Sequence, residues 1–451
     1  MSHTPYLLKN ATIVNEGSTW QGSLLLDKGL IAKIFPSGKH VVPPGGQCKV
    51  IDLEGLLLLP GVIDDQVHFR EPGLTHKGDI HSESRAAVAG GITSYMEMPN
   101  TSPQTTTQAL LEEKFRLAQE KSLANYSFYI GATNDNLGEL MASDPAMACG
   151  VKVFMGSSTG NMLVDSPSAL EGIFREVTVP VAVHCEDEAT IRANLTAAQQ
   201  GYGEEIPCFM HAVIRSHEAC ERSSRLAVRM AEKYGTRLHL LHLSTRNEIR
   251  MLRNDQPLKD KRITAEACVH HLWFHIDDYD RKGALIKWNP SVKYNTDRLG
   301  LINGIKEGYI DVVATDHAPH TLEEKSKPYK ECPSGGPMVQ HALPAMLSLA
   351  KKHRISIEKI VELMCHNPAI CFNIKGRGFI REGYAADLVV ADPGKPLTIS
   401  KENIFYQCGW SPLEGTTLDA SVIYTFVNGN IVYEKGRFYE DIKGEALAFE
   451  R

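Results

Sequence analysis

The middle of the chain alternates short apolar runs with amphipathic stretches. The amphipathic stretches have the 3.6-residue spacing of helices and include residues 108–120, 212–234 and 296–307. Five segments consist of an apolar run with the length of a buried strand followed by polar side chains; they are residues 56–68, 150–152, 181–184, 240–242 and 310–316. This alternation predicts an α/β fold with a parallel sheet between residues 56 and 374.

The two ends of the chain have a different pattern of hydrophobic and turn residues. Residues 1–55 and 375–451 hold short strand-like runs separated by Gly, Pro and Asn turns. The turn Asn428-Gly429-Asn430 predicts a hairpin that joins residues 421–427 to residues 431–433. We expect both ends to build one small β domain together.

The strand ends favour a closed barrel over an open sheet. An open doubly wound sheet usually carries a glycine-rich phosphate loop after its first strand, and no such loop follows the apolar run 56–63. A closed (β/α)8 barrel collects polar groups from many strand ends at one rim. The sequence therefore predicts a barrel with its active site at the C-terminal rim.

The first apolar run ends in Asp64-Asp65-Gln66-Val67-His68-Phe69-Arg70. Side chains two positions apart on a strand point the same way, so Gln66, His68 and Arg70 should face one site. Imidazole, carboxylate and lysine groups recur at the later strand ends. Their recurrence indicates one convergent metal site.

Two later strands contribute histidines to this site. His184 closes the strand of residues 179–183, where a histidine held by hydrogen bonds alone is also a common arrangement. His239 and His242 are three residues apart, so a strand would send them to opposite faces. We assign His242 to the site and expect His239 to pack against the outer helices.

Lys152 and Asp316 are the other chemical candidates. A free ammonium at Lys152, inside a buried strand, would be costly to desolvate. Either it belongs to a buried ion pair, or it has reacted with carbon dioxide to form a metal-binding carbamate. Asp316 is a general-base candidate, since a carboxylate beside a metal can accept a proton from water and return it to a leaving group.

Composition narrows the range of functions. The 451 residues are 43% hydrophobic and carry a net charge of −6 without a basic stripe, which gives no reason to expect nucleic acid or an anionic membrane as a partner. The ten cysteines contain no Cys-x-x-Cys pair, so we expect free thiols in a reducing compartment. Without a signal-peptide pattern or a bilayer-spanning run, the cytoplasm is the default location.

These segments together resemble the dihydroorotases of the amidohydrolase superfamily, from the first barrel strand to Gly429. The matching segments are Lys152 and residues 64–73, 98–101, 184–187, 242–245, 287–290 and 316–320. The resemblance implies a barrel of residues 56–374 and a small β-sandwich built from residues 1–55 and 375–451. It also implies reversible, zinc-dependent hydrolysis of dihydroorotate to N-carbamoyl-aspartate, the third step of pyrimidine synthesis.

The resemblance assigns roles by position. The implied metal ligands are His68, His184, His242, Asp316 and a carboxylated Lys152. The residues implied to contact substrate are Arg70, Asn100 and His320 around its carboxylate, and Asn289, Ser334 and Gly335 around its ring. The planar guanidinium of Arg70 suits a carboxylate, the group that uncharged cyclic amides lack. Zinc would polarise the scissile carbonyl, and Asp316 would move the proton.

One position departs from the family pattern, in which the first strand usually reads His-x-His. Here it reads Gln66-Val67-His68. An amide oxygen is a weak zinc ligand compared with imidazole. We therefore expect one firmly bound zinc at Lys152, His184 and His242, and a second position that is weak, empty or helped by Gln66. A spacer role for Gln66 fits equally well.

Two other functions stay open. A related cyclic amidase would act on allantoin or a hydantoin, and it would not need the clamp of Arg70 and Asn100. A non-catalytic relative would serve as a subunit of a transcarbamoylase complex, but it should have lost several metal positions. For an active enzyme, the family suggests a small-molecule substrate and a homodimer.

Three further features have structural or accessory interpretations. We expect His270-His271 to order a strand rather than to bind metal, because adjacent residues on a strand diverge. The thiol of Cys185 should face away from the site, since its neighbour His184 faces it. Residues 156–162 either cover bound substrate as a lid or form an ordinary surface turn.

Overall fold

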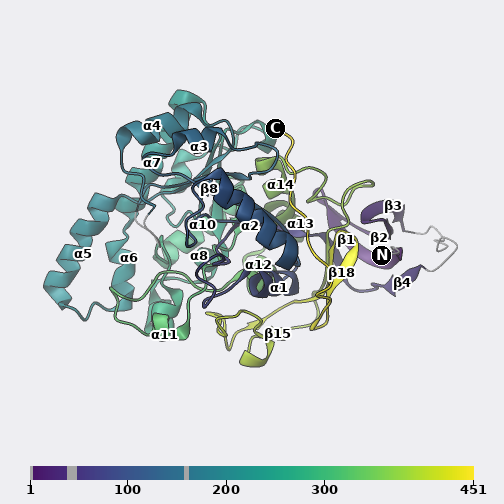
Figure 1. The fold of residues 1–451 in the computed structure, drawn as a ribbon. Coiled ribbons are helices and arrows are strands. Elements are labelled where there is room, and N and C mark those ends of the chain that lie inside the picture. The colour runs from purple at the N-terminus through teal and green to yellow at the C-terminus, as the bar shows by residue number, and fades with distance from the viewer. Residues whose placement is uncertain (1–3, 38–47, 157–161) are drawn as a thin grey trace.

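The chain folds into a parallel barrel with a second sheet beside it (Figure 1). The structure is a computed structural model that describes residues 4–37, 48–156 and 162–451. The expected lid, residues 156–162, lies mostly outside the described residues and stays a prediction. No helix in the described part of the chain is long and apolar enough to cross a membrane.

Eight parallel strands form the barrel in sequence order, as predicted. They are β6 (Val62–Val67), β7 (Ile92–Glu97), β8 (Asn125–Gly131), β9 (Gly150–Phe154), β10 (Val181–His184), β11 (Leu238–Leu240), β12 (Ile263–Cys268) and β13 (Val312–Ala314). The first and last strands meet through a parallel bridge between Val67 and His317, where the His68 amide donates to the His317 carbonyl at 2.7 Å. The barrel is therefore nearly closed.

Helices follow the strands around the outside (Figure 1). They are α1 (Ile80–Ala89), α2 (Gln108–Lys121), α3 (Leu137–Met141), α4 (Pro167–Glu176), α5 (Glu188–Tyr202), α6 (His211–Ile214), α7 (His217–Tyr234), α8 (Val269–Trp273), α9 (Tyr279–Lys282), α10 (Asn295–Glu307), α11 (Leu322–Lys325), α12 (Ala342–His353), α13 (Ile357–Val361) and α14 (Asn367–Phe372). The predicted helices 108–120 and 296–307 are confirmed as α2 and α10.

The predicted helix of residues 212–234 is two helices, α6 and α7. Ser216 has an extended backbone, and its side chain accepts a hydrogen bond from the Ala219 amide, so it caps a new helix. That helix ends at Gly235, whose φ of 70° lies in the left-handed region. The apolar spacing alone did not reveal the break, because a cap interrupts the backbone without interrupting the periodicity.

Strands from both ends of the chain form one nine-stranded sheet, as expected for a small β domain of both termini. They are β1 (Tyr6–Asn15), β2 (Ser18–Asp27), β3 (Leu30–Pro36), β4 (Lys49–Asp52), β5 (Leu57–Pro60), β14 (Leu388–Asp392), β17 (Ser421–Val427), β18 (Asn430–Glu434) and β19 (Arg437–Phe438). A separate ribbon pairs β15 (Leu397–Thr398) with β16 (Thr417–Leu418). Left-handed Asn428 and Gly429 form the predicted hairpin turn.

The sheet and the barrel are joined directly. β5 pairs with β1 and β14 of the terminal sheet and leads through Gly61 into the first barrel strand, β6. Residues from inside the barrel, such as Tyr129 and Leu241, pack in one apolar cluster with Phe372 of α14 and with Phe449. Apolar side chains thus fill part of the lower barrel, and the expected site residues lie toward the opposite, C-terminal rim.

Candidate active site

A pocket lies at the C-terminal ends of the barrel strands; we call it the rim pocket. Its lining residues are Gln66, His68, Lys152, Phe154, His184, His242, Trp288, Asn289, Asp316, Ala318, Ser334 and Gly335. Nine of the twelve site residues expected from the sequence are among them. The other three, Arg70, Asn100 and His320, lie behind this lining and contact its members or one another.

Backbone geometry aims several of these side chains. Arg70, His242 and Asp316 have positive φ values of 73°, 38° and 45°. Such values are uncommon for residues other than glycine and concentrate where surrounding structure enforces them, as at functional sites. Each of these residues lies just beyond the end of a strand, where side chains no longer alternate between the two faces of the sheet. The left-handed backbone therefore sets the direction of its side chain.

His184 and His242 bring two ring nitrogens together. His184 Nδ1 lies 3.0 Å from His242 Nε2, and the opposite nitrogen of His184 lies 3.0 Å from a Glu186 carboxylate oxygen. Burial lowers the pKa of both imidazoles, His242 well below its usual value. The Glu186 carboxylate lies on the Nε2 side of His184, and the Nδ1 side faces His242, so a proton or a cation must separate the two facing nitrogens.

Lys152 is almost fully buried, with 1% of its surface exposed. Its ammonium lies 4.7 Å from the centre of the Phe154 ring and forms no ion pair with any described residue. Desolvation lowers the pKa of Lys152 to about 8, so a larger fraction of the amine is neutral at physiological pH than for an exposed lysine. Of the two interpretations of Lys152, the geometry disfavours the buried ion pair.

His68, Gln66 and Asp316 form the opposite wall. Asp316 Oδ1 lies 3.1 Å from His68 Nε2 and accepts a hydrogen bond from Gln66 Nε2 at 3.3 Å. His68 Nδ1 donates to Asn100 Oδ1 at 2.7 Å. Burial raises the pKa of Asp316, which suits a base that must hold a proton near neutral pH. Gln66 thus presents its amide nitrogen, not its oxygen, to the carboxylate.

Arg70, packed against the neutral ring of His320, forms a cationic corner next to the pocket. Arg70 is 2% exposed, its Nε donates to the Pro319 carbonyl at 3.0 Å, and its Nη2 lies 3.1 Å from His320 Nε2. That same His320 nitrogen lies 3.1 Å from the Ser334 carbonyl of the pocket lining. Burial lowers the pKa of Arg70 to about 10, so it stays charged at neutral pH.

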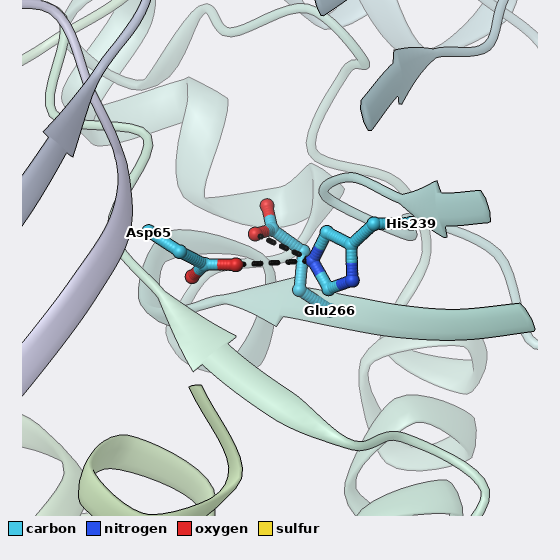
Figure 2. Close-up of side chains that lie close together, drawn as sticks. All are labelled: Asp65, His239 and Glu266. Atoms are coloured by element: carbon cyan, nitrogen blue, oxygen red, sulfur yellow. Dashed lines mark ion pairs between the residues drawn. The ribbon is translucent and has the colours of Figure 1, made fainter. Parts of the chain in front are cut away.

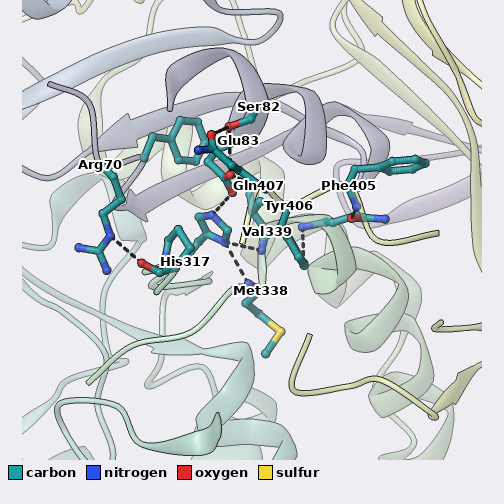
Figure 3. A network of polar contacts seen from close by, with 12 residues as sticks. Arg70, Ser82, Glu83, His317, Met338, Val339, Phe405, Tyr406 and Gln407 are labelled. Atoms are coloured by element: carbon teal, nitrogen blue, oxygen red, sulfur yellow. Dashed lines mark hydrogen bonds and ion pairs between the residues drawn. The ribbon is translucent and has the colours of Figure 1, made fainter. Parts of the chain in front are cut away.

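A buried network behind Asp316 was missed by the sequence reasoning (Figure 3). His317 Nε2 lies 2.7 Å from a Glu83 oxygen, and both side chains are fully buried. His317 Nδ1 accepts from the backbone amides of Met338 and Val339 at 3.0 and 3.3 Å. This arrangement ties α1 to the loop that carries Asp316. The only sequence signal was His317 itself, within the segment 316–320.

The expectation that His239 packs against the outer helices is wrong. His239 is paired in register with Ala182, which is paired with Lys152, so all three face the barrel interior. His242 lies beyond the end of β11, and its positive φ turns it toward the interior as well. The three-residue spacing between His239 and His242 gave a wrong prediction because side chains alternate between the two faces only within a strand.

His270 and His271 lie in the short helix α8, not on a strand as expected. The His270 ring stacks on Trp288 of the pocket wall, with ring centres 4.3 Å apart. His271 Nε2 lies 3.0 Å from the Pro290 carbonyl. Both rings therefore support the wall of the rim pocket. The thiol of Cys185 packs in the apolar cluster outside the barrel, as expected, and all ten cysteines are free.

The donor set fits a metal ion. The facing nitrogens of His184 and His242 have the spacing of neighbouring ligands, and His242 Nδ1 has no hydrogen-bond partner among the described residues. Glu186 would orient His184 as an outer carboxylate does in metal sites, and Arg215 pairs with Glu186 in turn. Lys152 lies close enough to interact electrostatically with both imidazoles and forms no ion pair with a described carboxylate; as a carbamate it would complete the set.

Comparison with known proteins identifies the family. The model of the amidohydrolase family matches residues 57–432, so the chain belongs to this family. It is 33% identical over 439 residues to a dihydroorotase of Methanosarcina mazei, covering 94% of this chain and 93% of that one. A dihydroorotase of Aquifex aeolicus is 31% identical, with 95% and 99% covered. The predicted resemblance is thus confirmed.

Solved structures agree on the fold. The L-hydantoinase (dihydropyrimidinase) of Arthrobacter aurescens superimposes with a TM-score of 0.89 at 27% identity, covering 96% of this chain and 97% of that one. A dihydropyrimidinase of Brevibacillus agri gives a TM-score of 0.87 at 23% identity, with 99% and 100% covered. The barrel with its additional sheet is therefore the fold of this hydrolase family.

Proposed function

We propose that the protein is a zinc-dependent dihydroorotase that interconverts dihydroorotate and N-carbamoyl-aspartate in pyrimidine synthesis. The observation that carries the proposal is the cationic corner. Arg70 is buried beside the rim pocket and forms no ion pair with any described carboxylate. A buried guanidinium that no carboxylate contacts directly is costly, so an anionic group of the substrate is the natural partner.

The residues of the pocket divide the work. Arg70, Asn100 and His320 hold the substrate carboxylate, while Asn289, Ser334 and Gly335 contact the ring. Gly335 has a φ of 128°, and a Cβ there would lie 2.5 Å from the Ala318 carbonyl oxygen, so only glycine lets this backbone approach the ring. These contacts orient the cyclic amide toward Asp316.

Asp316 moves the proton. His68 Nε2 and Gln66 Nε2 both lie against Oδ1, which leaves Oδ2 for proton transfer. The carboxylate takes a proton from the attacking water and delivers it to the departing ring nitrogen; the reverse reaction uses the same path. A zinc ion held by Lys152 as its carbamate, His184 and His242 would supply Lewis-acid chemistry for the carbonyl.

The contact of Arg70 with the substrate carboxylate predicts a preference for dihydroorotate over uncharged cyclic amides. Replacing Arg70 by glutamine should lower kcat/KM for dihydroorotate by about 10²–10³-fold, because a charge-assisted contact to the carboxylate is lost. Turnover of hydantoin and allantoin, measured in parallel, should change little. The matched control is Arg377→Gln, a buried arginine of the terminal sheet region that pairs with Asp387. A wild-type protein that hydrolyses hydantoin or allantoin but not dihydroorotate refutes the proposed substrate.

Gln66 predicts a single metal in the rim pocket. Its amide nitrogen faces Asp316, and its oxygen lies 3.7 Å from the Cys268 thiol. Gln66→His should create a second imidazole ligand beside His68. Anomalous scattering at the zinc edge should then show two peaks in the rim pocket instead of the one expected for the wild type. One unchanged peak in the variant means that Gln66 does not limit the metal count.

The expectation of a homodimer and the possible association with a transcarbamoylase stay predictions. Sedimentation of the purified chain, alone and with a transcarbamoylase, measures both. The non-catalytic alternative requires a rim pocket that takes up no zinc even when zinc and bicarbonate are supplied. The expected ligand residues His68, Lys152, His184, His242 and Asp316 all line the rim pocket, and only the histidine at position 66 is replaced. This supports a catalytic function over the non-catalytic alternative.

A further inference from the structure

A second group of possible ligands lies inside the barrel, below the rim pocket (Figure 2). We call Asp65, His239 and Glu266 the deep triad. They come from β6, β11 and β12, and at most 2% of each is exposed. His239 Nε2 lies 3.0 Å from Asp65 Oδ2 and 3.5 Å from Glu266 Oε2, and one ligand atom of each residue lies within 4.8 Å of the others.

Hydrogen bonds fix the outer sides of the deep triad. His239 Nδ1 lies 2.8 Å from Thr264 Oγ1, and that hydroxyl donates to the Leu238 carbonyl at 3.4 Å. The imidazole therefore donates from Nδ1 and turns Nε2 inward. Glu266 Oε1 accepts from the His242 amide at 2.8 Å. An outer partner that fixes the ring of a histidine is the usual arrangement around a ligating imidazole.

The inner atoms of the deep triad lack hydrogen bonds. Both carboxylate oxygens of Asp65, together with Glu266 Oε2 and His239 Nε2, have no hydrogen-bond partner in the described part of the chain, although the ion-pair distances are short. Buried polar atoms are rarely left in this state. Convergent oxygen and nitrogen atoms without hydrogen bonds indicate an additional atom between them.

Although desolvation lowers it, the Asp65 and Glu266 carboxylates raise the pKa of His239 to about 9, so a proton is the competitor of a divalent cation at this position. A protonated His239 would offset one of the two carboxylates and could aim its Nε2 hydrogen at only one oxygen. A divalent cation would offset both and would use the Nε2 lone pair of a neutral ring. One imidazole and two carboxylates form a donor set that first-row transition ions accept, zinc among them.

We propose that the deep triad binds a divalent first-row transition cation, such as zinc, separately from the rim pocket. The site is structural: it joins β6 to β11 and β12 across the barrel interior. It also touches the rim pocket indirectly, because Glu266 holds the backbone of His242. At the opposite end of the barrel, a cavity of about 420 Å³ has His239, Leu238 and Thr264 in its lining.

The test is to locate the metal in crystals of the full-length wild-type protein equilibrated with zinc. An anomalous peak at about 2.0–2.1 Å from His239 Nε2 is expected, distinct from the peak near His184 and His242. A peak in the rim pocket without one at His239 overturns the deep site. A peak at His239 without one in the rim pocket supports the deep site and contradicts the proposed zinc enzyme, so the two failures are distinguishable.

Metal content of variants gives an independent check. Asp65→Asn keeps the size of the side chain and should lower zinc by about one ion per chain while the rim peak persists. Lys152→Ala should instead remove the rim zinc and leave the deep one. If Asp65→Asn folds, as judged by circular dichroism, and keeps the full wild-type zinc content, the proposal is wrong. If it does not fold, the wild-type crystals still decide.

Discussion

Replacing Lys152 by alanine should abolish most of the activity, lowering kcat/KM for dihydroorotate by about 10³-fold or more. The variant loses the carbamate that would help hold the rim zinc, and with it several kcal/mol of transition-state stabilisation. The lowered pKa of Lys152 increases the fraction of neutral amine, which is the form that would react with carbon dioxide. Adding acetate with zinc should restore part of the activity, because a small carboxylate can enter the space left by the side chain.

Two measurements make this prediction specific. Carbon-13 NMR of the wild-type protein with labelled bicarbonate should show a carbamate signal that the variant lacks. The matched control is Lys293→Met, which removes another buried lysine, one that donates to Ser244 Oγ at 2.9 Å. This control should retain the carbamate signal and the rim zinc. A Lys152→Ala protein with more than a tenth of the wild-type activity contradicts the assigned role.

Replacing Asp316 by asparagine should lower kcat by about 10²–10⁴-fold in both directions of the reaction, since a carboxamide cannot accept the proton. The fold should persist, because asparagine has the same size and can still accept from Gln66. Steady-state kinetics with dihydroorotate and with N-carbamoyl-aspartate measure the effect. The rim zinc should stay at Lys152, His184 and His242, which the anomalous peak checks.

Asp311→Asn is the matched control for Asp316. Asp311 is also a buried carboxylate next to β13, but it pairs with Lys261 at 2.7 Å, away from the rim pocket. Its loss breaks a buried ion pair, so we expect a lower Tm with kcat within a few-fold of wild type. Equal losses of kcat in both variants would falsify a specific proton-transfer role for Asp316.

Much of the site could be predicted because barrel geometry turns local signals into spatial ones. Apolar runs that end in His68, Lys152, His184 or Asp316 needed only one assumption, that all strand ends meet at one rim. The structure brings these four residues to the same pocket. The terminal β domain could be predicted equally well, because its turns and short strands are local features of the sequence.

Other features depended on distant residues. The inward direction of His239 follows from its register with β10, and its partners Asp65 and Glu266 lie far from it in the sequence. The amide orientation of Gln66 depends on Asp316, 250 residues away. No local pattern encodes such contacts, so the deep triad could not be inferred from spacing.

The sequence by itself thus determined the barrel, its terminal sheet and the strand ends that carry chemistry, because hydrophobic periodicity and turn residues act locally. Only the tertiary structure decided which way side chains point beyond a strand end and which buried charges face one another. The physical reason is that positive φ values at His242 and Asp316 are imposed by packing, and pairing across the barrel is fixed by the closure of the sheet.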